Sequence, residues 1–141
     1  MYARATEMLA SEARLMNSRN LFGLASGFDF PLIVEIEGQT ILYVTPNAMM
    51  TGTADFLGDL AQQGYVSMHP RVRAVEMPRK GRFRIWAHWE HRNAAGVTVS
   101  VSDYLYHCRD RARSICVEMV QVQKAAHPAL VPNVTYQQFQ A

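Results

Sequence analysis

The sequence predicts an α+β domain in which helices pack in the concave face of a curved, mostly antiparallel sheet. The first observation behind this prediction is helical spacing of apolar residues in two segments, 2–17 and 46–64. The second is a run of extended segments with short turns over residues 65–124. The third is size, because 141 residues with 49% hydrophobic side chains suit one compact domain and leave no room for a second core.

The N-terminal part predicts two helices and a hairpin. An amphipathic helix is expected over residues 2–17, because one face would carry Ala5, Met8, Leu9, Ala13 and Met16 and the rest of the surface Arg4, Glu7, Ser11 and Arg14. A shorter helix is expected over 20–28, ending at Gly27. The apolar runs 31–37 and 40–45 surround Gly38 and Gln39, which predicts a hairpin turn.

A third helix is predicted to begin after Thr45. A threonine can cap a helix N-terminus with its hydroxyl, and Pro46 suits the first helical position. Apolar residues then recur at helical spacing until Gly64. Gly52 and Gly58 weaken this helix by about 1 kcal/mol each relative to alanine, so it should depend on tertiary packing.

Four long strands are expected over 65–77, 82–92, 97–108 and 114–124, forming an antiparallel meander. Residues 1–124 would make the single domain. The tail, residues 125–141, carries apolar side chains that suggest packing on a partner subunit.

The expected turn lengths place Arg92 opposite Val97 and Arg109 opposite Ser114. Because side chains alternate between the two faces of a strand, these pairings decide which residues share a face of the sheet. We assign one set to the concave face: Phe83, Ile85, Ala87, Trp89, His91, Ser100, Ser102, Tyr104, Tyr106, Val117, Met119, Gln121 and Gln123. The outer face would carry an apolar patch that predicts a homodimer: Trp86, Val99, Val101, Leu105, Val120 and Val122. A slip of one residue in either turn would exchange these groupings.

Charge and composition argue against several kinds of partner. Residues 1–70 hold three basic and seven acidic side chains, whereas residues 71–113 hold ten basic and four acidic ones. The arginines cluster at hairpin tips without stacking aromatics between them, so we expect no nucleic-acid binding. No apolar run is long enough to span a membrane and no secretory core is recognisable, so a cytoplasmic location is expected.

The two cysteines favour neither a metal nor a cofactor. Cys108 and Cys116 lie eight residues apart with no Cys-X-X-Cys pair. A disulfide across the hairpin is conceivable, but two small buried thiols are the favoured interpretation for a reducing compartment.

The element order, with Phe30-Pro31 opening the first strand and Tyr104 to Asp110 followed by Ile115 to Met119, resembles the nuclear transport factor 2-like superfamily. This superfamily includes SnoaL-like polyketide cyclases and ketosteroid isomerases, and the resemblance covers residues 3–124. It implies a cystatin-like cone, with a pocket between helices and sheet and commonly a homodimer formed through the sheet.

The ketosteroid isomerase branch places a carboxylate base directly before the proline of the first strand. Here that residue is Phe30, and Asp29 is one position away, on the other face of a strand. The position of the branch's donor acid falls on Tyr104. The resemblance therefore implies a hydrogen-bond donor without its base.

Three functions follow as hypotheses. The first is binding of a small, mostly apolar molecule, with the ligand-binding candidates Trp89, Ser102, Tyr104, Met119 and Gln121. The second is a lyase, isomerase or cyclase acting on a carbonyl compound, with Tyr104 as donor and His91 as proton carrier. The third is a small partner-dependent subunit, like the β subunits of ring-hydroxylating dioxygenases, in which the sheet docks another chain.

Overall fold

The computed structural model describes residues 1–124 and 136–139. In chain order its elements are α1 (Tyr2–Asn17), α2 (Leu21–Ala25), β1 (Phe28–Ile36), β2 (Gln39–Tyr43), α3 (Pro46–Gln62), β3 (Ser67–Val75), β4 (Arg82–Arg92), β5 (Thr98–Arg111), β6 (Ser114–Lys124) and β7 (Tyr136–Phe139). The elements predicted for residues 1–124 are all present, with ends that differ by a few residues. None of the helices in the described ranges is long and apolar enough to cross a membrane.

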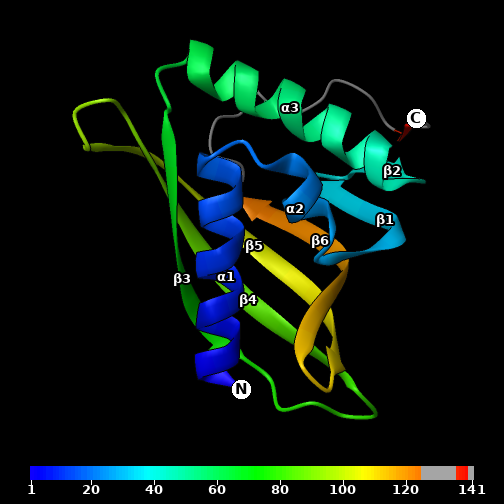
Figure 1. Ribbon diagram of the computed structural model, residues 1–141. Coiled ribbons are helices and arrows are strands. Elements are labelled where there is room, and N and C mark those ends of the chain that lie inside the picture. The colour runs from blue at the N-terminus through cyan, green and yellow to red at the C-terminus, as the bar shows by residue number, and fades with distance from the viewer. Residues whose placement is uncertain (125–135, 140–141) are drawn as a thin grey trace.

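The strands form one curved sheet in the order β3-β4-β5-β6-β1-β2-β7. Neighbouring strands are antiparallel except for two parallel pairs, β1 with β6 and β2 with β7. Figure 1 shows α1 lying along the concave side of the sheet and α3 crossing at one end of it. The predicted α+β architecture, with helices in the concave face of a mostly antiparallel sheet, is therefore confirmed.

The core lies between α1 and the concave face of the sheet. The helix buries Ala5, Leu9, Ala13 and Met16, which repeat at intervals of three and four residues. From the sheet, Ile85, Ala87 and Trp89 are almost completely buried on alternate positions of β4. Burial of each large apolar side chain stabilises the fold by roughly 1.5–3 kcal/mol.

The start of α3 follows the predicted capping pattern. The Thr45 hydroxyl oxygen accepts a hydrogen bond from the Ala48 backbone N–H at 3.2 Å, and Pro46 occupies the first turn. Gly52 has a role that the sequence did not indicate, because a Cβ atom there would overlap the hydroxyl of Tyr43. The glycine thus permits the close approach of α3 to β2, beyond its low helix propensity.

The predicted register of β4 and β5 places the correct residues on the concave face, whereas that of β5 and β6 is wrong. Trp89 pairs with Ser102 and not with Ser100, as Arg92 opposite Val97 would require, but a shift of two residues leaves the faces unchanged. Between β5 and β6, Cys108 pairs with Val117 but His107 pairs with Met119, so β6 carries an extra residue. This β-bulge reverses the alternation of faces from Met119 to Val122, where a second register shift follows. Consequently Val120 and Val122 face the concave side, and Met119 and Gln121 face the outer side.

The predicted C-terminal tail is only partly described. Residues 136–139 form β7, which pairs with β2 of the same chain. Residues 125–135 and 140–141 lie outside the described residues, so packing of the tail on a partner subunit stays a prediction. Cys108 and Cys116 are both buried free thiols, in agreement with the favoured interpretation.

Candidate functional site

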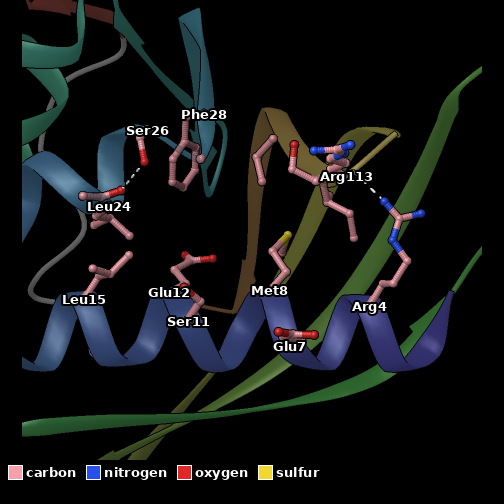
Figure 2. A pocket seen from close by; sticks show the side chains of 15 residues that line it. Arg4, Glu7, Met8, Ser11, Glu12, Leu15, Leu24, Ser26, Phe28 and Arg113 are labelled. Atoms are coloured by element: carbon pink, nitrogen blue, oxygen red, sulfur yellow. Dashed lines mark hydrogen bonds between the residues drawn. The ribbon is translucent and has the colours of Figure 1, made fainter. Parts of the chain in front are cut away.

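A cavity of about 360 Å³ lies between α1, α2 and the first residues of β6. It runs alongside α1, with Arg4 and Arg113 at one end and Leu15 and Leu24 at the other (Figure 2). Its lining residues are Arg4, Glu7, Met8, Ser11, Glu12, Leu15, Gly23, Leu24, Ser26, Gly27, Phe28, Arg113, Ser114, Ile115 and Val117.

Two neighbouring stripes of α1 explain this position. The buried stripe from Ala5 to Met16 packs on the sheet, and the next stripe around the helix, containing Arg4, Met8, Glu12 and Leu15, lines the cavity. The sequence analysis placed Arg4, Glu7 and Ser11 away from the core face of the helix, and the structure places all three on the cavity wall.

Contacts between distant segments close the remaining sides of the cavity. Arg4 joins α1 to the β5–β6 hairpin through an ion pair with Asp110 at 2.8 Å. The Val117 backbone N–H donates to the Gly27 carbonyl oxygen at 2.9 Å, which ties β6 to the loop after α2. The ion pair of Arg111 with Asp29, also 2.9 Å, joins the end of β5 to β1. Asp29 is therefore held in a salt bridge with the hairpin and does not line the cavity.

Glu12 connects the cavity to a hydrogen-bonded chain in the core. The carboxyl group projects from α1 into the cavity between Leu24 and Met8 (Figure 2). Its Oε1 atom accepts a hydrogen bond from the Tyr106 hydroxyl at 3.2 Å, and that hydroxyl accepts one from Trp89 Nε1 at 3.0 Å. Trp89 and Tyr106 are at most 1% exposed. These two hydrogen bonds thus fix the orientation of Glu12 Oε1 from inside the protein.

This environment changes the acidity of Glu12. Burial raises its pKa from 4.5 to about 7, and the hydrogen bond from Tyr106 offsets only part of that effect. Burial and the nearby Glu12 carboxylate raise the pKa of Tyr104 to about 12, and the same causes raise that of Tyr106 well above its usual value. Glu12 is therefore the group in this cluster that exchanges a proton near neutral pH.

Trp89, Ser102 and Tyr104, all predicted ligand-binding residues, share the concave face of the sheet. The rings of Tyr104 and Trp89 are 6.3 Å apart, and those of Tyr104 and Tyr106 are 5.9 Å apart. None of the three is among the residues that line the described cavity, and Trp89 is connected to it through Tyr106 and Glu12. Their direct contact with a ligand stays a prediction.

His91 was expected as a proton carrier under the enzyme hypothesis, and its surroundings do not favour that role. Its side chain is 0% exposed, its Nε2 atom lies 2.8 Å from the Ser102 hydroxyl, and its Nδ1 atom has no partner among the described residues. Burial, and secondarily the charge of His88, lowers its pKa to about 4. A ring in this setting remains neutral at neutral pH and cannot alternate between charge states there.

The other two ligand-binding candidates, Gln121 and Met119, lie on the outer face because of the bulge in β6. Gln121 bonds to His107 Nε2 at 2.7 Å and donates from its amide to Glu35 at 2.9 Å. These contacts form a polar row across the outer side of the sheet. The prediction that Gln121 and Met119 face the concave side is therefore wrong.

Glu12 is the residue that sequence reasoning missed, although a signal for it exists. It lies three residues after Leu9 and one before Ala13, inside the apolar face of the first helix. A lone carboxylate on a helix face that packs against a sheet requires a specific environment, and such groups are frequent at functional sites. Within the described residues no group of three or more His, Cys, Asp or Glu side chains is arranged to hold a metal ion.

Comparisons with known proteins identify the fold. No family model and no curated protein sequence matches the chain. Among solved structures, a ketosteroid isomerase-like protein from Erwinia carotovora atroseptica superposes with a TM-score of 0.64 at 11% identity, over 89% of this chain and 97% of that one. Aln2 from a Streptomyces species gives 0.65 at 14% identity over 87% and 89%. An NTF-2 like protein of unknown function from Shewanella oneidensis gives 0.62 at 9% identity over 82% and 93%.

The chain therefore has the cystatin-like cone fold of nuclear transport factor 2-like proteins, as the resemblance in its sequence implied. A shared fold at these identities carries no activity with it. The function has to be argued from the cavity and its residues.

Proposed function

We propose that the protein binds a small, mostly apolar molecule in the cavity beside Glu12. The observation that carries this proposal is the Glu12 carboxyl group, which projects into a cavity with large apolar side chains, among them Met8, Leu15, Leu24 and Phe28. Small-molecule sites typically combine apolar walls with a few polar groups that orient the ligand. A volume of about 360 Å³ suits a ligand at the small end of the usual range.

A matched pair of variants on α1 tests this proposal. Ser11→Trp would fill the cavity, whereas Arg14→Trp places the same side chain at an exposed position outside the lining. With 2-acetylnaphthalene as a probe, calorimetric titration should show at least about tenfold weaker binding to Ser11→Trp and near wild-type binding to Arg14→Trp. Equal binding by the two variants, or no binding by the wild type at millimolar probe, would contradict the proposal.

A second candidate, a lyase, isomerase or cyclase acting on a carbonyl compound, is favoured by the contact between Glu12 and Tyr106. A carboxyl group whose pKa is about 7 can take up and release a proton at neutral pH. In this candidate function, Glu12 and Tyr106 take the place of Tyr104 and His91. The test is whether the protein accelerates exchange of the methyl hydrogens of 2-acetylnaphthalene in deuterated water, with loss of the acceleration in Glu12→Gln.

The outer face of the sheet is the proposed surface for a homodimer. Trp86, Val101 and Leu105 lie there, and Val99 lies at the register shift near the start of β5. Val120 and Val122 no longer belong to this patch, because the bulge turns them inward. Sedimentation of the wild type should show a dimer, and Val99→Lys combined with Val101→Lys should give monomers. Val66→Lys is a matched control, since Val66 and Val99 are both 44% exposed.

The remaining expectations have separate tests. Co-purification with a tagged copy would reveal a partner-dependent subunit. Weak, salt-insensitive retention on heparin is expected if the protein binds no nucleic acid, because phosphate contacts make affinity strongly salt-dependent. A cytoplasmic location stays a prediction, which a fluorescent fusion would test.

A further inference from the structure

The direction of each hydrogen bond in the chain from Trp89 to Glu12 follows from the donors present. An indole N–H can only donate, so the Tyr106 hydroxyl oxygen accepts the bond from Trp89. The one hydrogen of Tyr106 is then directed to Glu12 Oε1. Because Oε1 already receives a hydrogen, a proton bound to Glu12 belongs on the other oxygen, Oε2.

Oε2 is the carboxyl atom available to a ligand. Among the described residues it has no hydrogen-bond partner, and it is not one of the buried polar atoms closed off without a partner. The carboxyl group projects into the cavity (Figure 2). Protonated Glu12 therefore offers a ligand an O–H donor, whereas ionised Glu12 offers it a negative charge.

Among the other charges around the cavity, Arg113 is the one that favours an anionic ligand. Arg4, Arg113 and Glu7 line it, and Arg113 has no ion pair within the described part of the chain. From the sheet, the titratable groups that interact with Glu12 are Tyr104, Tyr106 and Cys108, and burial raises the pKa of each so that all three stay neutral. With Glu12 protonated, the unpaired charges on the wall are, among the described residues, Arg113 and Glu7, because the charge of Arg4 is balanced by Asp110.

We propose that this cavity binds small, mostly apolar carboxylic acids as their anions, with protonated Glu12 donating a hydrogen bond from Oε2 to the ligand carboxylate. The inference rests on the proposed ligand-binding function and names its ligand class. Hydrogen bonds from a neutral O–H to a carboxylate are short and strong. The apolar body of the ligand packs against Met8, Leu15 and Leu24, and its charge is favoured by Arg113.

Binding of such an anion is linked to the protonation of Glu12. An ionised Glu12 would place two carboxylates against each other, so only the protonated protein is competent to bind. Since the pKa of Glu12 is about 7, the competent fraction falls about tenfold between pH 6 and pH 8. By reciprocity, binding of the anion draws a proton onto Glu12.

Three probes with one apolar body test the ligand class: 2-naphthoate, 2-acetylnaphthalene and 2-naphthylmethylamine. Calorimetric titration at pH 6 should rank the carboxylate tightest and the amine weakest. From pH 6 to pH 8 the carboxylate should lose about tenfold in affinity. Arg113→Gln should weaken the carboxylate by about two- to fivefold, as expected for a partly exposed charge contact, and should leave the ketone unaffected.

Glu12→Gln provides the sharpest comparison, because the glutamine carbonyl can accept from Tyr106 while its amide N–H₂ donates into the cavity at every pH. The carboxylate profile of this variant should be flat, so it should bind about tenfold more tightly than the wild type at pH 8. Glu37→Gln is the matched control, an exposed position outside the cavity lining, and should keep the wild-type profile.

Each result decides between the two proposals. Tightest binding of the amine or the ketone at pH 6, a flat carboxylate profile in the wild type, or an unchanged profile in Glu12→Gln would overturn the carboxylate assignment while leaving a ligand-binding cavity. Failure of all three probes, or equal binding by Ser11→Trp and Arg14→Trp, would overturn the ligand-binding function itself and the carboxylate assignment with it.

Discussion

Glu12 and His91 are both polar side chains set among apolar residues between helices and sheet, yet their surroundings differ. Glu12 receives a hydrogen bond on one oxygen and presents the other to a cavity. His91 is 0% exposed, contacts Ser102 and the ring of Tyr65, and does not line the cavity. Burial shifts both toward neutrality, raising the pKa of Glu12 to about 7 and lowering that of His91 to about 4.

The comparison shows that position on the concave face does not make a residue available to a ligand. Availability depends on where helix and sheet leave space between them. At α1 and α2 such a space exists, and the Glu12 carboxyl group projects into it. At His91 the packing is closed. The same physical effect, loss of solvation, therefore leaves His91 with a structural role.

The largest effect that would test the comparison is on the stability of Glu12→Gln at alkaline pH. Folding raises the pKa of Glu12 from 4.5 to about 7, so the wild type loses stability as pH rises through this window. At pH 8 the loss amounts to about 3 kcal/mol, which the glutamine variant avoids. Chemical denaturation should therefore show the variant more stable at pH 8 and similar at pH 4.5, with Glu37→Gln like the wild type at both.

A smaller effect on stability is expected around His91, where the packing is closed. Ser102→Ala removes the hydroxyl that contacts His91 Nε2 and leaves both nitrogens of this buried ring without a partner among the described residues. The free energy of unfolding should fall by about 1–2 kcal/mol. Ser18→Ala removes an exposed hydroxyl that bonds to the Leu15 carbonyl, and should change it by less than about 0.5 kcal/mol. Equal effects of the two substitutions would mean that His91 is solvated.

The smallest expected effect is on the pKa of Glu12, and it should differ between substitutions of Tyr106 and Tyr104. The hydrogen bond from Tyr106 lowers the pKa of Glu12, so Tyr106→Phe should raise that pKa further. Tyr104 makes no hydrogen bond to Glu12, and Tyr104→Phe should leave the Glu12 titration close to that of the wild type. Carboxyl ¹³C NMR of the two variants measures the difference. An equal response to both would show that the hydrogen-bonded chain does not run through Tyr106.

The elements could be predicted from sequence because their signals are local. The cap at Thr45 and Pro46, the stripe of α1 and the turns of the meander each involve residues close together in the chain. The faces of β4 and β5 also follow from alternation, although their register is two residues away from the predicted one. The bulge in β6 has no such signal, because an extra residue opposite His107 and Cys108 depends on how the whole sheet curves.

The candidate site was harder to predict for a related reason. The cavity is bounded by α1, α2 and the β5–β6 hairpin, which are joined by contacts such as Arg4 with Asp110 and Val117 with Gly27. These residues are far apart in sequence, so no local pattern places them together. Alternation identified Trp89, Ser102 and Tyr104 on the concave face, but it could not show that the space lies beyond Tyr106, at Glu12.

The most direct test of the account is the titration of Glu12 in the wild-type protein, followed through its carboxyl ¹³C resonance with Glu12→Gln to assign it. We expect a midpoint near pH 7, because the carboxyl group is buried beside Tyr106 without a cationic partner in the described chain. Addition of 2-naphthoate should move the midpoint to higher pH. A midpoint near 4.5, unchanged by the probe, would show a solvated carboxylate and contradict the assignment of this cavity as the functional site.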